Sequence, residues 1–153
     1  MSGVPLGAAA DAIETTTAML ENKTDQLSGL PVREIPRVQS AIAEARGLLG
    51  AARSYVYSSL ETQWRKLETG EVLTSQERAD VWLSRTNAFQ AGRQITRILY
   101  DAVGGSAIYS GKSPLDRHLR DMQTACQHIA GQAKGLEAVG ALLLGGDSRH
   151  PLL

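Results

Sequence analysis

The sequence predicts an all-α protein folded as an antiparallel four-helix bundle. Apolar residues recur every three or four positions along four long segments, which is the spacing that gathers them on one face of a helix. Glycine and proline separate these segments, and β-branched residues do not form the alternating runs that are typical of strands. Because the connections are short, consecutive helices are expected to run antiparallel.

The first two predicted helices cover residues 5–27 and 37–69, and glycine and proline punctuate the loop between them. The apolar stripe of the first helix contains Leu6, Ala9, Ile13, Thr17, Leu20 and Leu27. The stripe of the second contains Val38, Ile42, Ala45, Leu49, Ala52, Val56, Leu60 and Leu67. Gly70 is expected at the position that ends the second helix, because glycine adopts the left-handed conformation without strain.

The third predicted helix covers residues 74–103. Thr74 and Glu77 have the spacing of a capping box, in which each side chain satisfies a backbone N–H group of the other residue. Trp82 and Phe89 widen the apolar face of this helix. We therefore expect it to be central in the bundle, or to pack partly against a second subunit.

The fourth predicted helix covers residues 114–144, and its apolar spacing continues throughout this length. Ser113 is expected to cap its first turn. Gly131 and Gly135 weaken its middle, where we expect a bend. We interpret residues 1–146 as one helical bundle and residues 147–153 as a flexible tail.

Composition narrows the classes of function. Sixteen basic and sixteen acidic side chains cancel, so we expect neither a nucleic-acid partner nor an anionic membrane surface. The one cysteine, Cys126, fits a reducing cytoplasm, and its apolar neighbours favour packing over a nucleophilic role. The first basic residue is Lys23, so no signal peptide is indicated, and no segment has the character of a membrane span. None of the three histidines has a glutamate three positions before it, and we expect no metal site.

The stretch from Asp101 to Ile129 holds most of the residues that carry chemistry. Gly104 and Gly105 end one helix, and Pro114 begins the next. On residue types alone, two interpretations remain open. The stretch is either an ordinary corner between helices or the edge of a cofactor site, where backbone N–H groups face an anion.

The run GGSAIYSGKSPLDRHLRDMQTACQHI resembles the C-terminal helical domain of the acyl-CoA dehydrogenase superfamily. More narrowly, it resembles the flavin-dependent monooxygenases built on that fold, which are the oxygenase components of two-component systems. The resemblance covers Val4 to Leu144. It implies a chain that matches the last third of such an enzyme, without the N-terminal helical domain and the central β-domain.

The resemblance also implies roles for individual residues. His128 matches a histidine near the flavin ring and is the candidate catalytic residue, although a histidine packed in the core remains the alternative. Gly104 and Gly105 match a glycine pair near the flavin of a neighbouring subunit. Lys23 stands in a stretch, ENKT, that often carries a phosphate-binding arginine at the position of Asn22. Lysine lacks the planar fork of arginine, so binding of FAD in the family's form is less expected than binding of FMN or of free reduced flavin.

Three charged residues of the same stretch have structural interpretations as well. Arg117 is either a structural charge or a candidate for contact with a flavin phosphate across a subunit boundary. Arg120 and Asp121 are expected to be structural, as charges buried in a network. The acyl-CoA dehydrogenases carry a catalytic glutamate in the matching region, but residues 128–131 here contain no carboxylate. Proton abstraction by that base is therefore not expected.

The resulting hypothesis is the C-terminal domain of a flavin-dependent monooxygenase that hydroxylates a small organic or aromatic substrate. A dehydrogenase remnant with another base and a non-catalytic oligomerisation module remain alternatives. As partners we expect other copies of the chain, in a dimer or tetramer, and a flavin reductase. The cofactor is FAD or FMN, and the site is expected to be incomplete and inactive in this chain alone.

Overall fold

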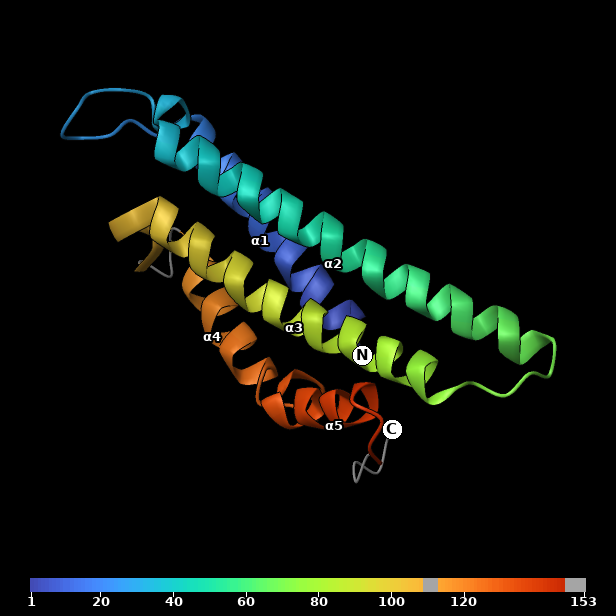
Figure 1. Ribbon diagram of the computed structural model, residues 1–153. Coiled ribbons are helices and arrows are strands. Elements are labelled where there is room, and N and C mark those ends of the chain that lie inside the picture. Colours follow the sequence, from blue (N-terminus) through green and yellow to red (C-terminus); the bar gives the residue numbers. More distant parts are fainter. Residues whose placement is uncertain (109–112, 148–153) are drawn as a thin grey trace.

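The computed structural model describes residues 1–108 and 113–147, and this part of the chain is helical (Figure 1). Its α-helices are α1 (Gly3–Glu21), α2 (Pro36–Glu68), α3 (Ser75–Val103), α4 (Leu115–Ala125) and α5 (Ala133–Leu143). Its short 3-10 helices are η1 (Val32–Glu34), η2 (Gly104–Ile108) and η3 (Ile129–Gly131). The all-helical prediction is confirmed, with five α-helices in place of four. The predicted tail lies outside the described residues apart from Asp147.

Helix α3 is the centre of the molecule. Figure 1 shows it between α1 and α2 on one side and α4 and α5 on the other, and it contacts all four. Trp82, Phe89, Ile95 and Leu99 are all buried, which confirms the central position predicted for this helix. Its wide apolar face is covered within the chain, so the alternative that part of it waits for a second subunit is wrong.

The boundaries of α2 and α3 lie within one residue of those predicted. Gly70 has φ +73° and follows the end of α2, as its position indicated. Thr74 caps α3, because its hydroxyl accepts a hydrogen bond from the Glu77 N–H at 3.2 Å. The Glu77 carboxylate accepts from the Thr74 N–H at 2.9 Å, which completes the predicted capping box.

Helix α1 ends six residues before its predicted end. The backbone beyond it turns back on itself, because the N–H of Val32 donates to the carbonyl of Lys23 at 2.8 Å. Asp25 tightens this turn by accepting from the N–H and the hydroxyl of Ser28. Leu27, expected on the apolar stripe, is therefore 99% exposed at the tip of a loop.

The predicted fourth helix is two helices, and the break between them lies at residues 126–132. The chain folds back so closely that a Cβ atom on Gly131 would lie 2.9 Å from the Cα of Cys126. Two contacts hold the break against α3: the Cys126 thiol donates to the Phe89 carbonyl at 3.4 Å, and the Gln90 amide donates to the Gly131 carbonyl at 2.9 Å. A bend was expected here, but tertiary contacts convert it into a full interruption.

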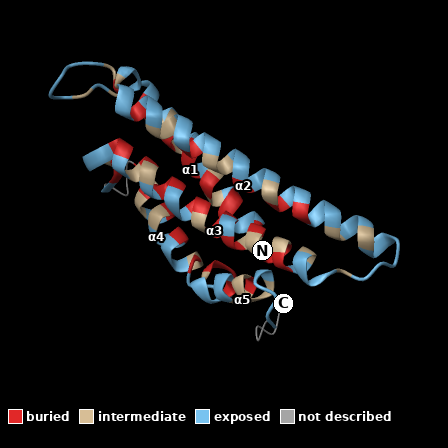
Figure 2. Ribbon diagram, viewed as in Figure 1, coloured by how far each residue is buried: buried red, intermediate tan, exposed pale blue. Residues whose placement is uncertain are grey.

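The outer side of α2 carries a second apolar stripe, which we call the outer seam: Tyr57, Leu60, Trp64 and Leu67. Figure 2 shows the outer side of this helix to be largely exposed, and Trp64 is 65% exposed. Leu60 and Leu67 were predicted to face the core, and that prediction is wrong. Their spacing fits the inner and the outer stripe almost equally, because the two stripes differ by one residue.

Among the helices of the described residues, none combines the length and the apolar character needed to cross a bilayer.

The closeness of Gly131 to Cys126 gives a test of the break. Gly131→Ala places a methyl group against backbone atoms of residue 126, which have little freedom to move. Such overpacking typically costs about 1–3 kcal/mol of unfolding free energy. Gly140→Ala is the matched control, since no atom lies within 4 Å of its Cβ position in α5. The control should be neutral or stabilising by up to about 1 kcal/mol. Equal urea midpoints for the two variants would contradict this account of the break.

Glu77, at the start of α3, gives the stability a defined pH dependence. The Lys66 ammonium at 2.6 Å, together with the N–H and hydroxyl groups of Thr74, lowers the pKa of this carboxyl to about 2. The stabilisation is present above the ordinary pKa near 4.5 and is lost as the pH falls towards 2. Glu77→Gln keeps the shape of the capping box but removes the charge. Its urea midpoint should lie below that of the wild type at pH 7, and the gap should close between pH 4.5 and 2. A gap of constant size over this pH range would show that the ion pair is not its source.

Candidate functional site

A cavity of about 690 Å³ lies at the C-terminal end of α3, between the loop after α1 and the 3-10 helix η2. It brings together three of the four residues that the sequence indicated for cofactor binding: Lys23, Gly104 and Gly105. Helices α2 and α3 separate Lys23 from the glycine pair in sequence, and these residues meet because α1 and α3 end on the same side of the bundle (Figure 1). The volume lies within the usual range for small-molecule sites.

The glycine pair presents its backbone to open space. Gly104 ends α3 with φ +65°, a conformation that residues with a Cβ rarely adopt. No atom lies within 4 Å of the Cβ position at Gly104 or at Gly105. A ligand can therefore approach the main chain here more closely than side chains would permit, as a cofactor edge requires.

Lys23 already has a partner. Its ammonium group donates a hydrogen bond to the carbonyl of Val103 at 2.9 Å, at the last residue of α3. A cation at this end of a helix satisfies an otherwise unpaired carbonyl and opposes the negative end of the helix dipole. Lys23 thus joins the end of α1 to the end of α3.

Two further charges line the cavity. Hydrogen bonds from the Ser28 hydroxyl and N–H, and the nearby positive charge of Arg37, hold the pKa of Asp25 below its ordinary value. Arg37 lies in the first turn of α2 and is exposed. Among the described residues, no carboxylate lies within ion-pair distance of its guanidinium. Arg37 was not singled out in the sequence. The sequence does contain a signal for Arg37: it is a cation in a first helical turn without an acidic residue, where the helix dipole disfavours positive charge.

His128 lies in the break between α4 and α5 and not on a helix, so its predicted place on a continuous fourth helix is wrong. Its Nδ1 accepts a hydrogen bond from the N–H of Ala130 at 3.2 Å, so the neutral ring carries its proton on Nε2. The ring is stacked on Phe89 of α3, with centroids 6.2 Å apart. The residue as a whole is exposed, so it is not a histidine packed in the core.

His128 and the glycine pair form two separate surfaces within one chain. His128 contacts α3 at Phe89, whereas Gly104 lies beyond the end of the same helix. At the rise of an α-helix these two points are about 22 Å apart. The chain therefore does not bring the candidate catalytic residue and the cavity into one site.

The charged residues of α4 lie away from the cavity. Arg117 is exposed and is not among the residues that line the cavity. Arg120, whose side chain is 69% exposed, pairs with Asp116 at 3.0 Å, and Asp121 is exposed. The expectation that Arg120 and Asp121 are buried in a network is therefore wrong. The inward face of α4 is formed by Leu115, His118 and Met122, and the helical spacing turns the other three outward.

Sequence reasoning did not identify a role for His118. Its side chain is 8% exposed, and its Nε2 lies 3.1 Å from the Asp11 carboxylate of α1, without the alignment of a good hydrogen bond. The spacing Leu115, His118, Met122 could have indicated that it is buried. In the described part of the chain, no three His, Cys, Asp or Glu side chains are placed to hold a metal ion.

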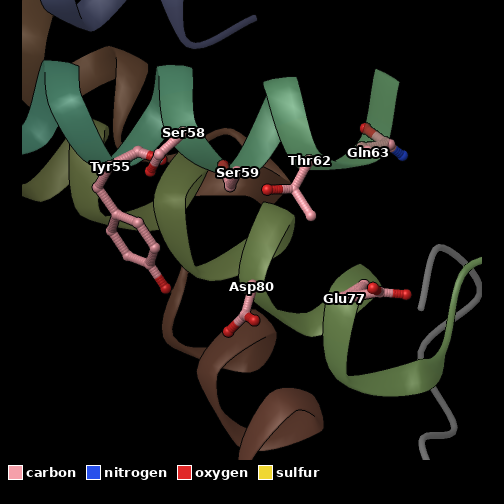
Figure 3. A pocket seen from close by; sticks show the side chains of 7 residues that line it. All are labelled: Tyr55, Ser58, Ser59, Thr62, Gln63, Glu77 and Asp80. Carbon is pink, nitrogen blue, oxygen red and sulfur yellow. The ribbon is translucent and has the colours of Figure 1, made fainter. Parts of the chain in front are cut away.

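A smaller polar pocket, of about 270 Å³, lies between α2 and the start of α3 (Figure 3). Tyr55 and Asp80 face it, and burial together with the charge of Asp80 raises the pKa of Tyr55. Its other main groups are already engaged: Glu77 caps α3, and the Ser59 hydroxyl donates to that of Ser84 at 2.8 Å. These polar groups hold α2 to α3, so the cavity at the end of α3 is the better candidate for a site.

Comparison with known proteins assigns the chain to a family. Residues 1–133 match the family described as "Acyl-CoA dehydrogenase, C-terminal domain", so the chain belongs to this family. It is 27% identical over 125 residues to the indole-3-acetate monooxygenase of Acinetobacter baumannii, covering 82% of this chain and 32% of that protein. It is 30% identical over 158 residues to a pigment production hydroxylase of Rhodococcus erythropolis, covering 97% and 39%. The chain thus spans 32% to 39% of the length of these relatives.

A solved structure agrees with the fold. The structure of XiaF from a Streptomyces species, described as a complex with FADH2 and glycerol, superimposes with a TM-score of 0.89 at 20% identity. The superposition covers 99% of this chain and 39% of that one. The relatives include monooxygenases and a hydroxylase by name, solved structures of the same fold are described as complexes with FADH2 or FAD, and this chain corresponds to the C-terminal domain of the acyl-CoA dehydrogenase family.

Proposed function

We propose that the chain is the C-terminal domain of a two-component flavin-dependent monooxygenase that hydroxylates a small organic or aromatic substrate. The observation that carries this proposal is the cavity at the end of α3, which gathers Lys23, Gly104 and Gly105 in a fold shared with flavin monooxygenases. The glycine pair leaves room for a ligand against the main chain. The cations Lys23 and Arg37 outnumber the carboxylate of Asp25 along the cavity, which suits an anionic phosphate group.

The cofactor would be held by its phosphate-bearing part in this cavity, with the backbone of Gly104 and Gly105 against it. A reduced flavin, when bound, supplies the activation of molecular oxygen that hydroxylation needs. The residues of this chain bind and orient it. FAD and FMN both carry the phosphate group that the cavity suits, and the absence of an arginine at Asn22 favours FMN or free reduced flavin.

His128 is the residue of this chain that we propose at the reacting centre. Its ring is oriented by the stack on Phe89 and by the hydrogen bond to Nδ1, so that Nε2 can donate a proton or hold a substrate oxygen. Because His128 packs on Phe89, about 22 Å along α3 from the glycine pair, each chain would serve two flavins. Its glycine pair would meet the flavin of a neighbouring subunit, and its histidine would face its own.

This arrangement requires a homo-oligomer. The outer seam of α2 offers an exposed apolar surface on which two subunits can pack. A flavin reductase is proposed as the second component, since the oxygenase receives its flavin reduced. Arg117 on α4 is retained as a candidate for contact across the subunit boundary. The cytoplasm is the proposed compartment, because the lone Cys126 suits reducing surroundings.

Replacing His128 tests the catalytic proposal. With the remaining domains supplied on the same chain or as a separate polypeptide, His128→Ala should lower coupled hydroxylation about 100-fold to 10,000-fold, the usual range for acid–base groups. Release of hydrogen peroxide should rise as oxygen transfer becomes uncoupled. Unfolding free energy should fall by only about 1–2 kcal/mol, since an exposed ring loses little packing.

Cys126→Ala is the control, two residues away in the same break. Burial raises the pKa of the Cys126 thiol, so the side chain is a packing group and its loss should change stability more than hydroxylation. Hydroxylation at the wild-type rate in His128→Ala, or unfolding of that variant, would remove His128 from the reaction.

Assembly is tested on the outer seam. At micromolar concentration the chain should sediment as a dimer or larger species, or bind a dye specific for exposed apolar surface. Trp64→Lys should reduce association or dye binding, because it places a charge in the middle of the seam. Val72→Lys, at an exposed apolar residue outside the seam, should change neither. A monomeric wild type that binds no dye is the contrary result.

A further inference from the structure

The two cations of the cavity at the end of α3 differ in what they already contact. The ammonium group of Lys23 is 2.9 Å from the carbonyl of Val103, to which it donates a hydrogen bond. The guanidinium of Arg37 has no ion pair among the described residues, although it is near enough to Asp25 to lower the pKa of that carboxyl. Asp25 itself is held by Ser28 through two hydrogen bonds of 2.9 and 2.7 Å.

We propose that Arg37, and not Lys23, is the residue of this chain that binds the phosphate group of the flavin nucleotide. Lys23 is a positioning residue, which fixes the end of α3 so that Gly104 and Gly105 face the cavity. This inference rests on the proposed function and adds to it the residue that recognises the anion. The arginine expected by resemblance at Asn22 is thereby supplied from the start of the next helix.

The chemistry of the two side chains supports this division. A guanidinium offers a planar fork of N–H donors that fits two phosphate oxygens at once, whereas an ammonium group is a point charge. Moving Lys23 onto a ligand would leave the Val103 carbonyl without its donor at the end of α3. Arg37 can move onto a ligand without breaking an ion pair among the described residues. Its position in the first turn of α2 is unfavourable for a cation, because it lies at the positive end of the helix dipole. Arg37 does attract the carboxylate of Asp25, but this attraction is at an exposed site and the helix dipole opposes the cation, so an arginine here adds little to the stability of the fold.

The position of Arg37 permits a variant that separates binding from folding. In Arg37→Glu a carboxylate replaces the cation in the first turn of α2, where the helix dipole favours it. The variant gains the favourable dipole interaction and loses the attraction to Asp25, so its melting temperature should stay close to that of the wild type while it binds an anion less well. Arg37→Gln removes the charge alone. Arg33→Gln is the matched control, since Arg33 is a nearby exposed arginine that does not line the cavity.

The test is a titration of the full 153-residue chain with FAD, FMN and riboflavin, followed by the amide NMR signals of Gly104 and Gly105. Riboflavin has the same ring system without phosphate. The wild type should bind FMN or FAD more tightly than riboflavin. Arg37→Gln should lose about 10-fold to 100-fold in affinity for the phosphorylated flavins, because this is the free energy that a charge-assisted hydrogen bond contributes to binding. The variant should keep its affinity for riboflavin. Arg37→Glu should lose at least as much, and Arg33→Gln should match the wild type.

Lys23→Gln provides the opposite pattern. It should lower the melting temperature and keep the preference for phosphorylated flavins over riboflavin. The inference is overturned if Arg37→Gln and Arg37→Glu retain that preference, or if Lys23→Gln loses it without loss of stability. A different failure tests the proposed function itself: a wild-type chain in which none of the three flavins shifts the two glycine signals has no flavin site at this cavity.

Discussion

The apolar residues of α3 must be shielded from water along the whole helix, and the other helices pack around α3 to shield them. Its apolar residues are distributed around the helix, so a single neighbour cannot bury them. α1 and α2 cover one side, and α4 and α5 cover the other. The ends of the other helices are therefore fixed relative to α3, and both candidate surfaces are located by it: the glycine pair continues its C-terminus, and His128 rests on Phe89 in its middle.

The sequence was informative wherever local chemistry decides the structure. The capping box of Thr74 and Glu77 and the glycine at Gly70 mark helix boundaries because each acts within a few residues of its own position. The break at Cys126 was underestimated because its cause is tertiary. The apolar spacing continues from α4 into α5, and only the contacts with Phe89 and Gln90 show that the chain turns back. The prediction for Leu27 was wrong because backbone hydrogen bonds within residues 23–32 close a loop at this point, and α1 ends before it.

The candidate site was predictable in part. Lys23, Gly104 and Gly105 were indicated through a family resemblance and do line one cavity. The distance between that cavity and His128 was not predictable, because residue spacing does not reveal which part of α3 the break will contact. Arg120 shows a limit of another kind. A charge next to another charge in sequence was interpreted as a buried network, whereas helical spacing turns both residues to solvent.

The attachment of α5 has a consequence for the motions of the protein. This helix of eleven residues is too short to be stable alone, and the ring of Trp82 packs directly on its backbone at Gly135. Detachment of α5 from α3 would leave most of the bundle intact while exposing Trp82 to water and freeing one end of the break that carries His128. The fluorescence of Trp82 thus reports on a local opening next to the histidine, on a free-energy scale separate from global unfolding.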